Sequence, residues 1–385
     1  ERERERERKR RKQEQNTKNK NTNMQTMIMD FSSINTELGH KHYSYPSIEQ
    51  FRNVIYNVNH KATYVGKDEN GEAIYRKDKV KPKLVFRGTT KLHGTNASVI
   101  INIKTGLVYC QSRENIISPT KDNAGFATFI ASIQQEFCEY ITSNVDAGDS
   151  DIIAVYGEWC GGSIQKGVAL NGLEKMFVIF DIRLINSETD VRTWLSEDIV
   201  KNFKIVEKRV FNIYDFETWE IEIDFEYPQL SQNKLIEITT LIEQKCPVGA
   251  AFGKEGVGEG AVWKCITGDY AANSGFWMKV KGEKHSSSKV KTIAAVDTEK
   301  VNSIKEFVEL AVTENRCQQG IDKLREAGKP LTRASLGDFL RWVYGDIVKE
   351  ELDTIIKNGL EVKDISSHVS SKARQWFFDN EINFN

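Results

Sequence analysis

A lysine and a histidine within Val85–Ile101 (VFRGTTKLHGTNASVII) lie where covalent chemistry is possible. Lys91 and His93 are found between two apolar runs and beside a glycine, a pattern that predicts strand, tight turn and strand. Residues two apart on an extended chain point to the same side, so these two side chains are expected to share a face. An uncharged lysine amine is a nucleophile, and lowering its pKa from about 10.4 by about three units is worth roughly 4 kcal/mol, which nearby cations or loss of water supply. The competing interpretation is a surface hairpin with an incidental lysine.

Charged and aromatic residues recur at the ends of the other predicted strands. They are Arg113, Glu158, Phe180, Glu259, Lys279 and Lys281. Two lysines can hold a phosphate, a glutamate can bind Mg²⁺ or a ribose hydroxyl, and an aromatic ring can stack on a base. Each residue also has an ordinary explanation, as a rim ion pair, a core ring, a flexible turn or a solvated strand face. Taken together with Lys91, they predict a nucleotide site.

Several other kinds of site do not fit the sequence. Gly328-Lys329 is followed by Pro330 rather than Ser or Thr, so there is no Walker A loop, and no G-x-G-x-x-G follows a predicted strand. The six cysteines form no C-x-x-C pair and no His/Cys cluster, which predicts reduced thiols in an intracellular protein rather than a zinc site or a disulfide frame. Without a run of 18 apolar residues or an apolar signal region, neither a membrane span nor a signal peptide is expected.

The charge of the chain is uneven. The formal net charge is −1, but residues 1–29 hold ten Lys and Arg against five Glu (+5), which leaves 44 basic and 50 acidic residues (−6) in the remainder. Any contact with RNA or DNA must therefore come from a local patch. Residues 1–23 are low in complexity and contain no apolar group, so residues 1–29 are expected to form a disordered tail. This tail is either translated upstream sequence or a basic segment that aids RNA binding or nuclear entry.

The rest of the chain must fold into elements that position these residues. Besides the two strands that flank Lys91, the predicted strands are 107–113, 151–159, 175–183, 260–265 and 276–281. Helical spacing predicts helices at 124–144 and 231–245, and Asn70-Gly71 predicts a hairpin turn. After a polar linker at 282–291 the apolar spacing becomes helical, which predicts a helical domain of about 95 residues.

The order and spacing of these motifs resemble the covalent nucleotidyltransferase superfamily. The match is closest to RNA ligases of the phage double-stranded-nick-sealing type and to the trypanosome RNA-editing ligases, whose motif K-x-H-G-T-N is found at Lys91–Asn96 without a mismatch. The further motifs, in order, are Q-S-R at 111–113, G-E-W-C-G-G at 157–162, F-D at 180–181, E-G-A-V at 259–262 and K-V-K at 279–281. DNA ligases and capping enzymes carry K-x-D-G instead, and a β-barrel where this sequence shows helical spacing.

The resemblance implies an α+β fold, with a nucleotidyltransferase (ATP-grasp-like DNA/RNA ligase) core of antiparallel sheets plus a C-terminal all-helical domain. The expected domains are a disordered tail at 1–29, an adenylyltransferase (RNA ligase) domain at 30–285 and a helical domain at 292–385. ATP and Mg²⁺ are the implied cofactors. The implied partner is RNA, as a nicked duplex or bridged ends, and the protein is expected to be a monomer without membrane contact.

The resemblance also implies a role for each motif residue. Lys91 attacks the α-phosphate of ATP and forms lysyl-AMP, the AMP passes to an RNA 5′-phosphate, and a 3′-hydroxyl then displaces it. The implied catalytic residues are Lys91, His93 and Asn96, and the implied metal ligand is Glu259, with Glu255 as the alternative. The implied nucleotide-binding residues are Thr90, Lys91, Leu92, Asn96, Arg113, Glu158, Phe180, Lys279 and Lys281, with Phe177 as an alternative ring for stacking on adenine.

Two other functions stay open. The first is another covalent nucleotidyltransferase, a DNA ligase or an mRNA guanylyltransferase, which His93 and the helical C-terminal spacing disfavour. The second is a non-catalytic RNA-binding relative, which the intact Lys91 and Glu259 disfavour.

Overall fold

The computed structural model describes residues 40–76, 78–285, 304–357 and 359–380. The predicted tail at 1–29 and residues 286–291 of the predicted linker lie outside these ranges. The chain divides into two compact units. Among the described residues, unit 1 comprises residues 40–45, Thr95–Trp159 and Met176–Asn212, and unit 2 comprises those of Pro46–Gly94, Cys160–Lys175 and the described part of the chain from Ile213 onward.

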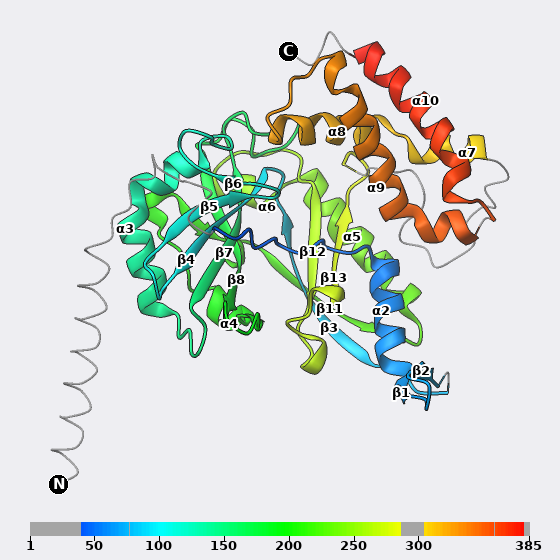
Figure 1. Cartoon of the computed structure of the whole chain (residues 1–385), viewed down its shortest axis with the longest axis horizontal. Helices are drawn as coiled ribbons and strands as arrows, with labels where there is room; N and C mark the ends of the chain where they lie inside the picture. Colours follow the sequence, from blue (N-terminus) through cyan, green and yellow to red (C-terminus); the bar gives the residue numbers. More distant parts are fainter. Residues whose placement is uncertain (1–39, 77, 286–303, 358, 381–385) are drawn as a thin grey trace. The chain divides into compact units, whose positions relative to one another are not determined.

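Unit 1 is built on a seven-stranded sheet with the order β10-β8-β7-β4-β5-β6, in which β9 pairs with β8. Strands β4 to β8 of this sheet are labelled in Figure 1. Its strands are β4 (Thr95–Asn102), β5 (Val108–Ser112), β6 (Ile116–Ile117), β7 (Ile152–Cys160), β8 (Met176–Ile185), β9 (Arg192–Trp194) and β10 (Val210–Asn212). The β4 strand is antiparallel to both β5 and β7, whereas β10 pairs with β8 in parallel. The strands predicted at 107–113, 151–159 and 175–183 are confirmed as β5, β7 and β8.

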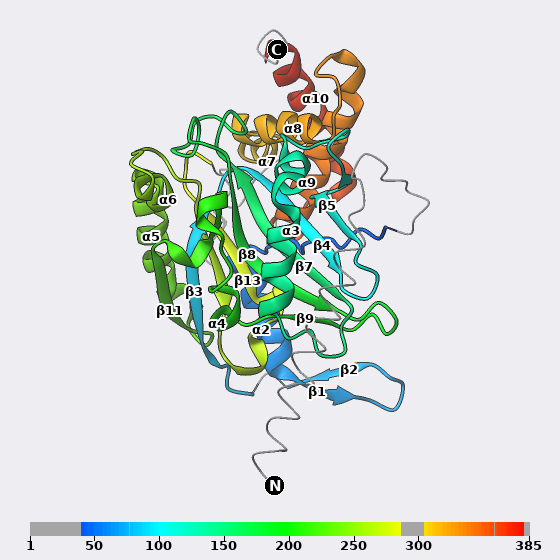
Figure 2. The ribbon, with the colours of Figure 1, turned by 90° about the vertical axis from the view of Figure 1, so that its left-hand side faces the viewer.

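Helix α3 (Phe126–Asn144) lies across one face of this sheet (Figure 2). The rings of Phe126 and Phe137 both contact Phe177 of β8, with centroids 4.9 and 6.5 Å apart. The buried side chains of α3 recur at helical spacing, so the helix predicted at 124–144 is confirmed. Unit 1 also contains the short helix α4 (Glu197–Val200).

Unit 2 contains a four-stranded antiparallel sheet with the order β11-β3-β12-β13. Its strands are β3 (Lys83–Lys91), β11 (Thr218–Asp224), β12 (Gly260–Cys265) and β13 (Trp277–Lys281). Unit 2 also holds α2 (Phe51–Thr63), α5 (Gln232–Gln244), α6 (Pro247–Ala251) and the antiparallel pair β1 (Tyr64–Lys67) and β2 (Ala73–Tyr75). The predicted strands at 260–265 and 276–281, the helix at 231–245 and the hairpin turn at Asn70-Gly71 are therefore confirmed.

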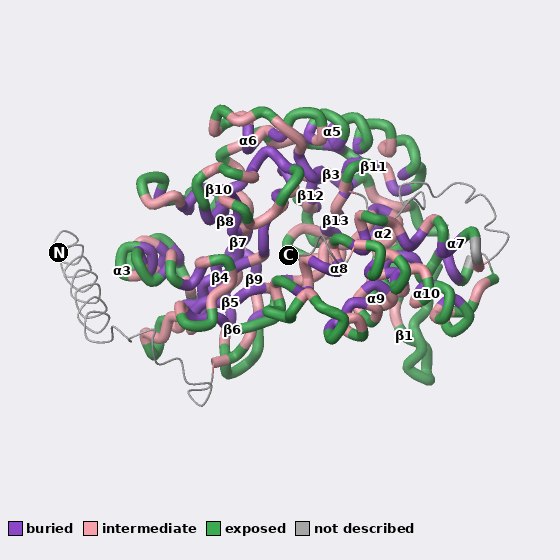
Figure 3. Tube along the Cα trace, turned by 90° about the horizontal axis from the view of Figure 1, so that it is seen from above, coloured by how far each residue is buried: buried purple, intermediate pink, exposed green. Residues whose placement is uncertain are grey.

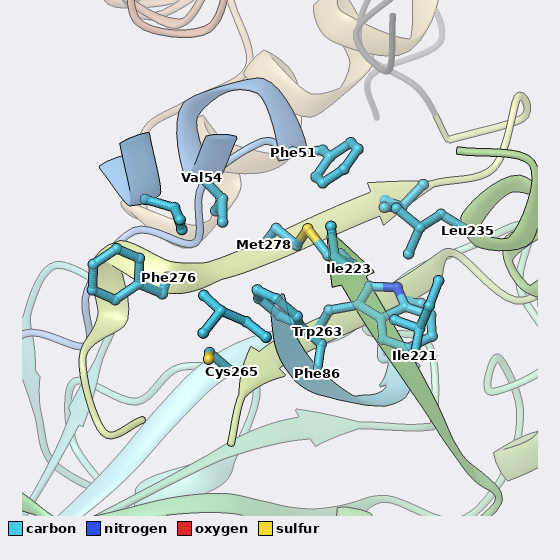
Figure 4. Close-up of a cluster of buried hydrophobic side chains, with 14 of the residues drawn as sticks. Phe51, Val54, Phe86, Ile221, Ile223, Leu235, Trp263, Cys265, Phe276 and Met278 are labelled. Carbon is cyan, nitrogen blue, oxygen red and sulfur yellow. The ribbon is translucent and has the colours of Figure 1, made fainter. Parts of the chain in front are cut away.

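One face of the four-stranded sheet is apolar and packs against α2 and α5 (Figure 4). Trp263 of β12 is fully buried there, and it leaves no room for a side chain at Gly88 of β3, where a Cβ would lie 2.6 Å from the indole ring. The buried residues of this core include Phe51, Val54, Phe86, Ile223, Leu235 and Met278. Because side chains alternate along each strand, the lysines that end β3 and β13 project from the opposite face.

The two strands that flank the motif lysine do not pair with each other. β3 ends at Lys91 as a central strand of the sheet of unit 2, whereas β4 begins at Thr95 in the sheet of unit 1. Only Leu92, His93 and Gly94 connect them. The predicted strand, turn and strand are present, but the surface-hairpin interpretation is wrong because each strand finds its partners in a different sheet.

The described C-terminal residues are helical, as their apolar spacing predicts. The helices are α7 (Ile304–Ala311), α8 (Glu314–Glu326), α9 (Leu336–Lys357) and α10 (Val362–Asn380). Their side chains form a core of their own, which includes Phe307, Ile321, Phe339, Ile347 and Phe377. Buried and exposed stretches alternate along these helices (Figure 3), as expected for amphipathic helices that pack on one another.

Two further sequence predictions concern the described residues. None of the helices in the described ranges has the length and apolar character needed to cross a membrane. All six cysteines are buried free thiols. Burial raises the pKa of Cys110 well above its usual range, so this thiol is poorly reactive.

Candidate active site

Two lysines are aligned across three neighbouring strands of unit 2. Lys91, the last residue of β3, is paired with Gly260 of β12, and Gly260 is in turn paired with Lys281 of β13. Directly opposed residues of neighbouring strands point to the same face, so both ammonium groups project from the face opposite the apolar core. Gly260 carries no side chain, and therefore nothing from β12 separates the two lysines.

Gly260 is required by its backbone as well as by the space around it. Its φ is +148°, and a Cβ would lie 2.1 Å from the carbonyl oxygen of Val280 on β13. We expect Gly260→Ala to destabilise the fold by roughly 3–5 kcal/mol, from backbone strain added to overpacking. Urea unfolding measures this change, with Gly337→Ala as the control because a Cβ there meets nothing within 4 Å. Equal midpoints for the two variants would contradict this account of β12.

Glu259 joins the two lysines and the motif histidine. Its Oε2 accepts a 2.7 Å hydrogen bond from Lys91 Nζ and lies 3.2 Å from His93 Nδ1, and its Oε1 lies 3.3 Å from Lys281 Nζ. The side chain is only 3% exposed. Burial alone would raise the pKa of Glu259, but the charges of Lys91 and Lys281 and the hydrogen bond from His93 hold it well below its usual range. Glu259 is therefore a carboxylate, which only accepts hydrogen bonds, so His93 Nδ1 is the donor in this contact.

Lys281 lies near two residues that the sequence motifs do not include. Gln319 of α8 accepts a 3.3 Å hydrogen bond from Lys281 Nζ. The ring of His285 meets the ring of His93 edge-on, with centroids 5.3 Å apart, and burial lowers the pKa of His285 to about 4. Burial also lowers the pKa of Lys281, and the charges of Lys91 and Lys279 add to this effect while Glu259 opposes it. The positive charges on this face of the sheet thus lie close enough together to favour the binding of an anion.

The other lysine of the last motif is held by the C-terminal helices. Lys279 Nζ lies 2.9 Å from Glu350 Oε1 of α9, and Glu350 Oε2 accepts a hydrogen bond from Gln50 Nε2, next to α2. Glu350 is 9% exposed. Its burial would raise its pKa, but Lys279 and the hydrogen bond from Gln50 lower it from the ordinary 4.5 to about 2.

This lowered pKa predicts an acid-sensitive contribution to stability. A carboxyl group whose pKa is lower in the folded state stabilises fully above its unfolded pKa and loses this effect as the pH falls through its folded pKa. For Glu350 the window runs from about pH 4.5 down to about pH 2, and the contribution is of the order of 3 kcal/mol. Urea unfolding of wild type and Glu350→Gln at several pH values measures it. We expect their difference to shrink across this window, and a difference independent of pH would contradict the assignment.

Unit 1 groups a second set of predicted residues. Asn96 of β4 is paired with Glu158 of β7, and Arg113 comes directly after Ser112, which is paired with Ala97. All three motif residues therefore lie at the same edge of the sheet, where β4 begins and where its neighbours β5 and β7 end. Their side chains are partly exposed, as a binding role requires.

The two candidate stacking rings on β8 differ in burial. Phe177 is fully buried, and it packs so closely on β7 that a Cβ at Gly157 would lie 2.4 Å from its ring. Phe180 is partly exposed and contacts Tyr45, with ring centroids 4.9 Å apart. A core ring cannot stack on a ligand, so the geometry favours Phe180 over Phe177.

Thr90 and Leu92, on either side of the motif lysine, are buried. The pairing of β11 with β3 ends at Thr89, so Thr90 lies beyond the last β11 pair. Its Oγ1 is buried and, among the described residues, has no hydrogen-bond partner. Unit 2 thus contains the motif residues Thr90, Lys91, Leu92, His93, Glu259, Lys279 and Lys281, and unit 1 contains Asn96, Arg113, Glu158 and Phe180.

The predicted metal site rests on one carboxylate. Within the described ranges, no three His, Cys, Asp or Glu side chains gather into a group that could hold a metal ion by themselves. Mg²⁺ usually keeps several waters and binds one or two carboxylates together with substrate phosphates. Glu259 therefore fits a metal ion that arrives with a nucleotide, whereas Glu255 is exposed and paired with Lys245.

Comparison with known proteins places this site in a family. The family model described as RNA ligase matches residues 85–281, more than half of the chain and all of the motifs. The chain belongs to the RNA ligase family. The resemblance is confirmed at this level, and the narrower phage or trypanosome type stays a prediction. No curated protein matches the sequence of this RNA ligase family member.

Solved structures of an RNA ligase from Naegleria gruberi are similar to this family member. A lysine-to-alanine mutant with ATP and Mn is 16% identical, with a TM-score of 0.40, and the match covers 63% of this chain and 56% of that one. The same ligase with PPi is 16% identical, with a TM-score of 0.39, and the match covers 66% of this chain and 61% of that one. The chain therefore spans less than two thirds of the length of these ligases.

Proposed function

We propose that this RNA ligase family member is an ATP-dependent enzyme that joins 3′-hydroxyl and 5′-phosphate RNA ends through lysyl-AMP and RNA-adenylate, at nicks in duplex RNA. The observation that carries the proposal is the cluster in which Glu259 holds Lys91, His93 and Lys281. A nucleophilic amine, a buried carboxylate and a second cation are the groups that attack on a nucleotide α-phosphate requires.

In the first step Lys91 Nζ attacks the α-phosphorus of ATP. The new N–P bond forms as the bond to pyrophosphate breaks, and the Lys91 ammonium group must first release a proton to water, because only the neutral amine is a nucleophile. Glu259 orients the amine through its 2.7 Å hydrogen bond, and Lys281 balances the charge that develops on the phosphate oxygens. A divalent metal, which we take to be Mg²⁺, would neutralise further phosphate charge beside Glu259.

The family resemblance assigns roles to four further residues. Arg113 and Glu158 would bind the ribose, Phe180 would stack on adenine, and Asn96 would act in strand sealing. The partly exposed positions of these four side chains support the assignment. In the same proposal, residues 30–285 form the adenylyltransferase domain, and residues 292–385 form a helical domain that binds the RNA. The enzyme acts as a monomer.

Two assays test the proposal. In the first, purified protein with Mg²⁺ receives labelled ATP or labelled GTP, and we expect an acid-labile adduct from ATP alone. In the second, nicked RNA duplex, nicked DNA duplex, bridged RNA ends and single-stranded RNA ends are compared, and we expect sealing to be fastest at the RNA nick. A GTP adduct would instead indicate a guanylyltransferase, preference for DNA a DNA ligase, and the absence of any adduct a non-catalytic relative.

A further inference from the structure

We propose that Glu350, on the C-terminal helix α9, is a positioning residue that acts through Lys279, so that the C-terminal helices complete the nucleotide site. This inference rests on the proposed function and extends it, because no family motif reaches α9. Its starting point is the ion pair between Lys279 and Glu350.

The carboxylate of Glu350 is fixed at both oxygens. Oε1 lies 2.9 Å from Lys279 Nζ, and Oε2 accepts the hydrogen bond from Gln50. The carboxylate is buried, whereas the Lys279 side chain remains 22% exposed. The glutamate of the pair is thus fixed by the protein around it, and the lysine side chain remains partly accessible.

The helix that carries Glu350 is itself anchored. The next residue, Glu351, is fully buried, and its carboxylate lies 3.4 Å from both Arg52, on α2, and Arg316, on α8. Arg316 also forms a 2.8 Å ion pair with Asp346, one turn earlier on α9. Breaking such buried pairs is strongly destabilising, so Glu350 has little freedom to move away from Lys279.

A phosphate is expected to bind Lys279 without displacing Glu350. An ammonium group has three N–H donors, and Glu350 uses one of them. If the phosphate displaced Glu350 from Lys279, the buried carboxylate of Glu350 would keep only Gln50 as a partner among the described residues. Leaving a buried charge in this way costs free energy. Lys279 also shares a strand face with Lys281, two residues away. Glu350 therefore holds the ammonium group of Lys279 in place for the nucleotide.

The test is the dependence of lysine adenylylation on ATP concentration. Glu350→Gln keeps the shape of the side chain but removes the charge, and we expect the KM for ATP to rise about tenfold with kcat changed less than threefold. A tenfold change matches the loss of one charge-assisted hydrogen bond. Glu361→Gln is the matched control, because Glu361 precedes α10 and its side chain is 64% exposed. Its KM should equal that of wild type.

A double-mutant cycle separates positioning from a general structural role. If Glu350 acts through Lys279, Glu350→Gln should have no further effect on KM in a Lys279→Ala background, whereas a purely structural defect would add to it. An unchanged KM in Glu350→Gln, or additive effects in the cycle, would overturn the inference. A lower KM would also overturn it, because Glu350 would then compete with the phosphate. Wild-type protein that forms no adduct with ATP would instead sink the proposed function itself.

Discussion

Replacing Lys91 with alanine is expected to abolish the covalent AMP adduct. The variant removes the amine that would form the N–P bond, and in the proposed mechanism the other two lysines of the site, Lys279 and Lys281, bind phosphate and do not attack it. Loss of a covalent nucleophile typically lowers the rate by several orders of magnitude, so we expect at least a 10⁴-fold decrease. Intact-mass spectrometry after incubation with ATP and Mg²⁺ measures the adduct directly.

Lys83→Ala is the matched control for this experiment. Lys83 is the first residue of the same strand, β3, and its side chain is 62% exposed. We expect it to leave the adduct unchanged, because its 3.4 Å pairing with Asp224 on the surface contributes little. An adduct of undiminished yield in Lys91→Ala would refute the assignment of the nucleophile.

Replacing Glu259 with glutamine is expected to lower the rate of adenylylation at least 100-fold. The substitution keeps the size of the side chain but removes the negative charge that three groups share, so the orientation of Lys91 is lost. Electrostatic groups placed at a reacting centre commonly contribute about 3–4 kcal/mol. The variant should also unfold more easily, by roughly 1–3 kcal/mol, because Lys91 and Lys281 lose their buried partner. Single-turnover kinetics and urea unfolding measure the two effects.

Glu255→Gln provides the control for Glu259. Both glutamates precede a glycine in the same loop, but the Glu255 side chain is 78% exposed and pairs with Lys245 on the surface. We expect wild-type kinetics and stability from this variant. If Glu255→Gln lost activity while Glu259→Gln retained it, the predicted metal site would move to Glu255.

The strand predictions near the site succeed because their sequence patterns are local. The alternation of buried and polar residues in β13 reflects a sheet with one apolar face. The continuous apolar runs of β7 and β8 reflect strands whose residues are nearly all buried. In β7, β8 and β13 the motif residues lie within the same short stretch of sequence that predicts the strand.

Glu350 escaped prediction although its helix was expected. The buried residues of α9 run through Phe339, Val343 and Ile347 at helical spacing, and Glu350 and Glu351 continue this stripe. Glutamates at core-facing positions are a signal, because buried charges require partners. The partners, Lys279 and Arg316, lie 71 and 35 residues away along the chain, and no spacing rule connects them.

The sequence alone determined the family, the motifs that carry the resemblance, and most strands and helices, because each of these depends on residues close together in the chain. Only the tertiary structure decided which residues meet. It separated β3 from β4 into different sheets, placed Gly260 between Lys91 and Lys281, and brought α9 to Lys279. These outcomes depend on strand pairing and on the burial of charges between distant segments, where the free energy belongs to the assembled contacts and not to any local pattern.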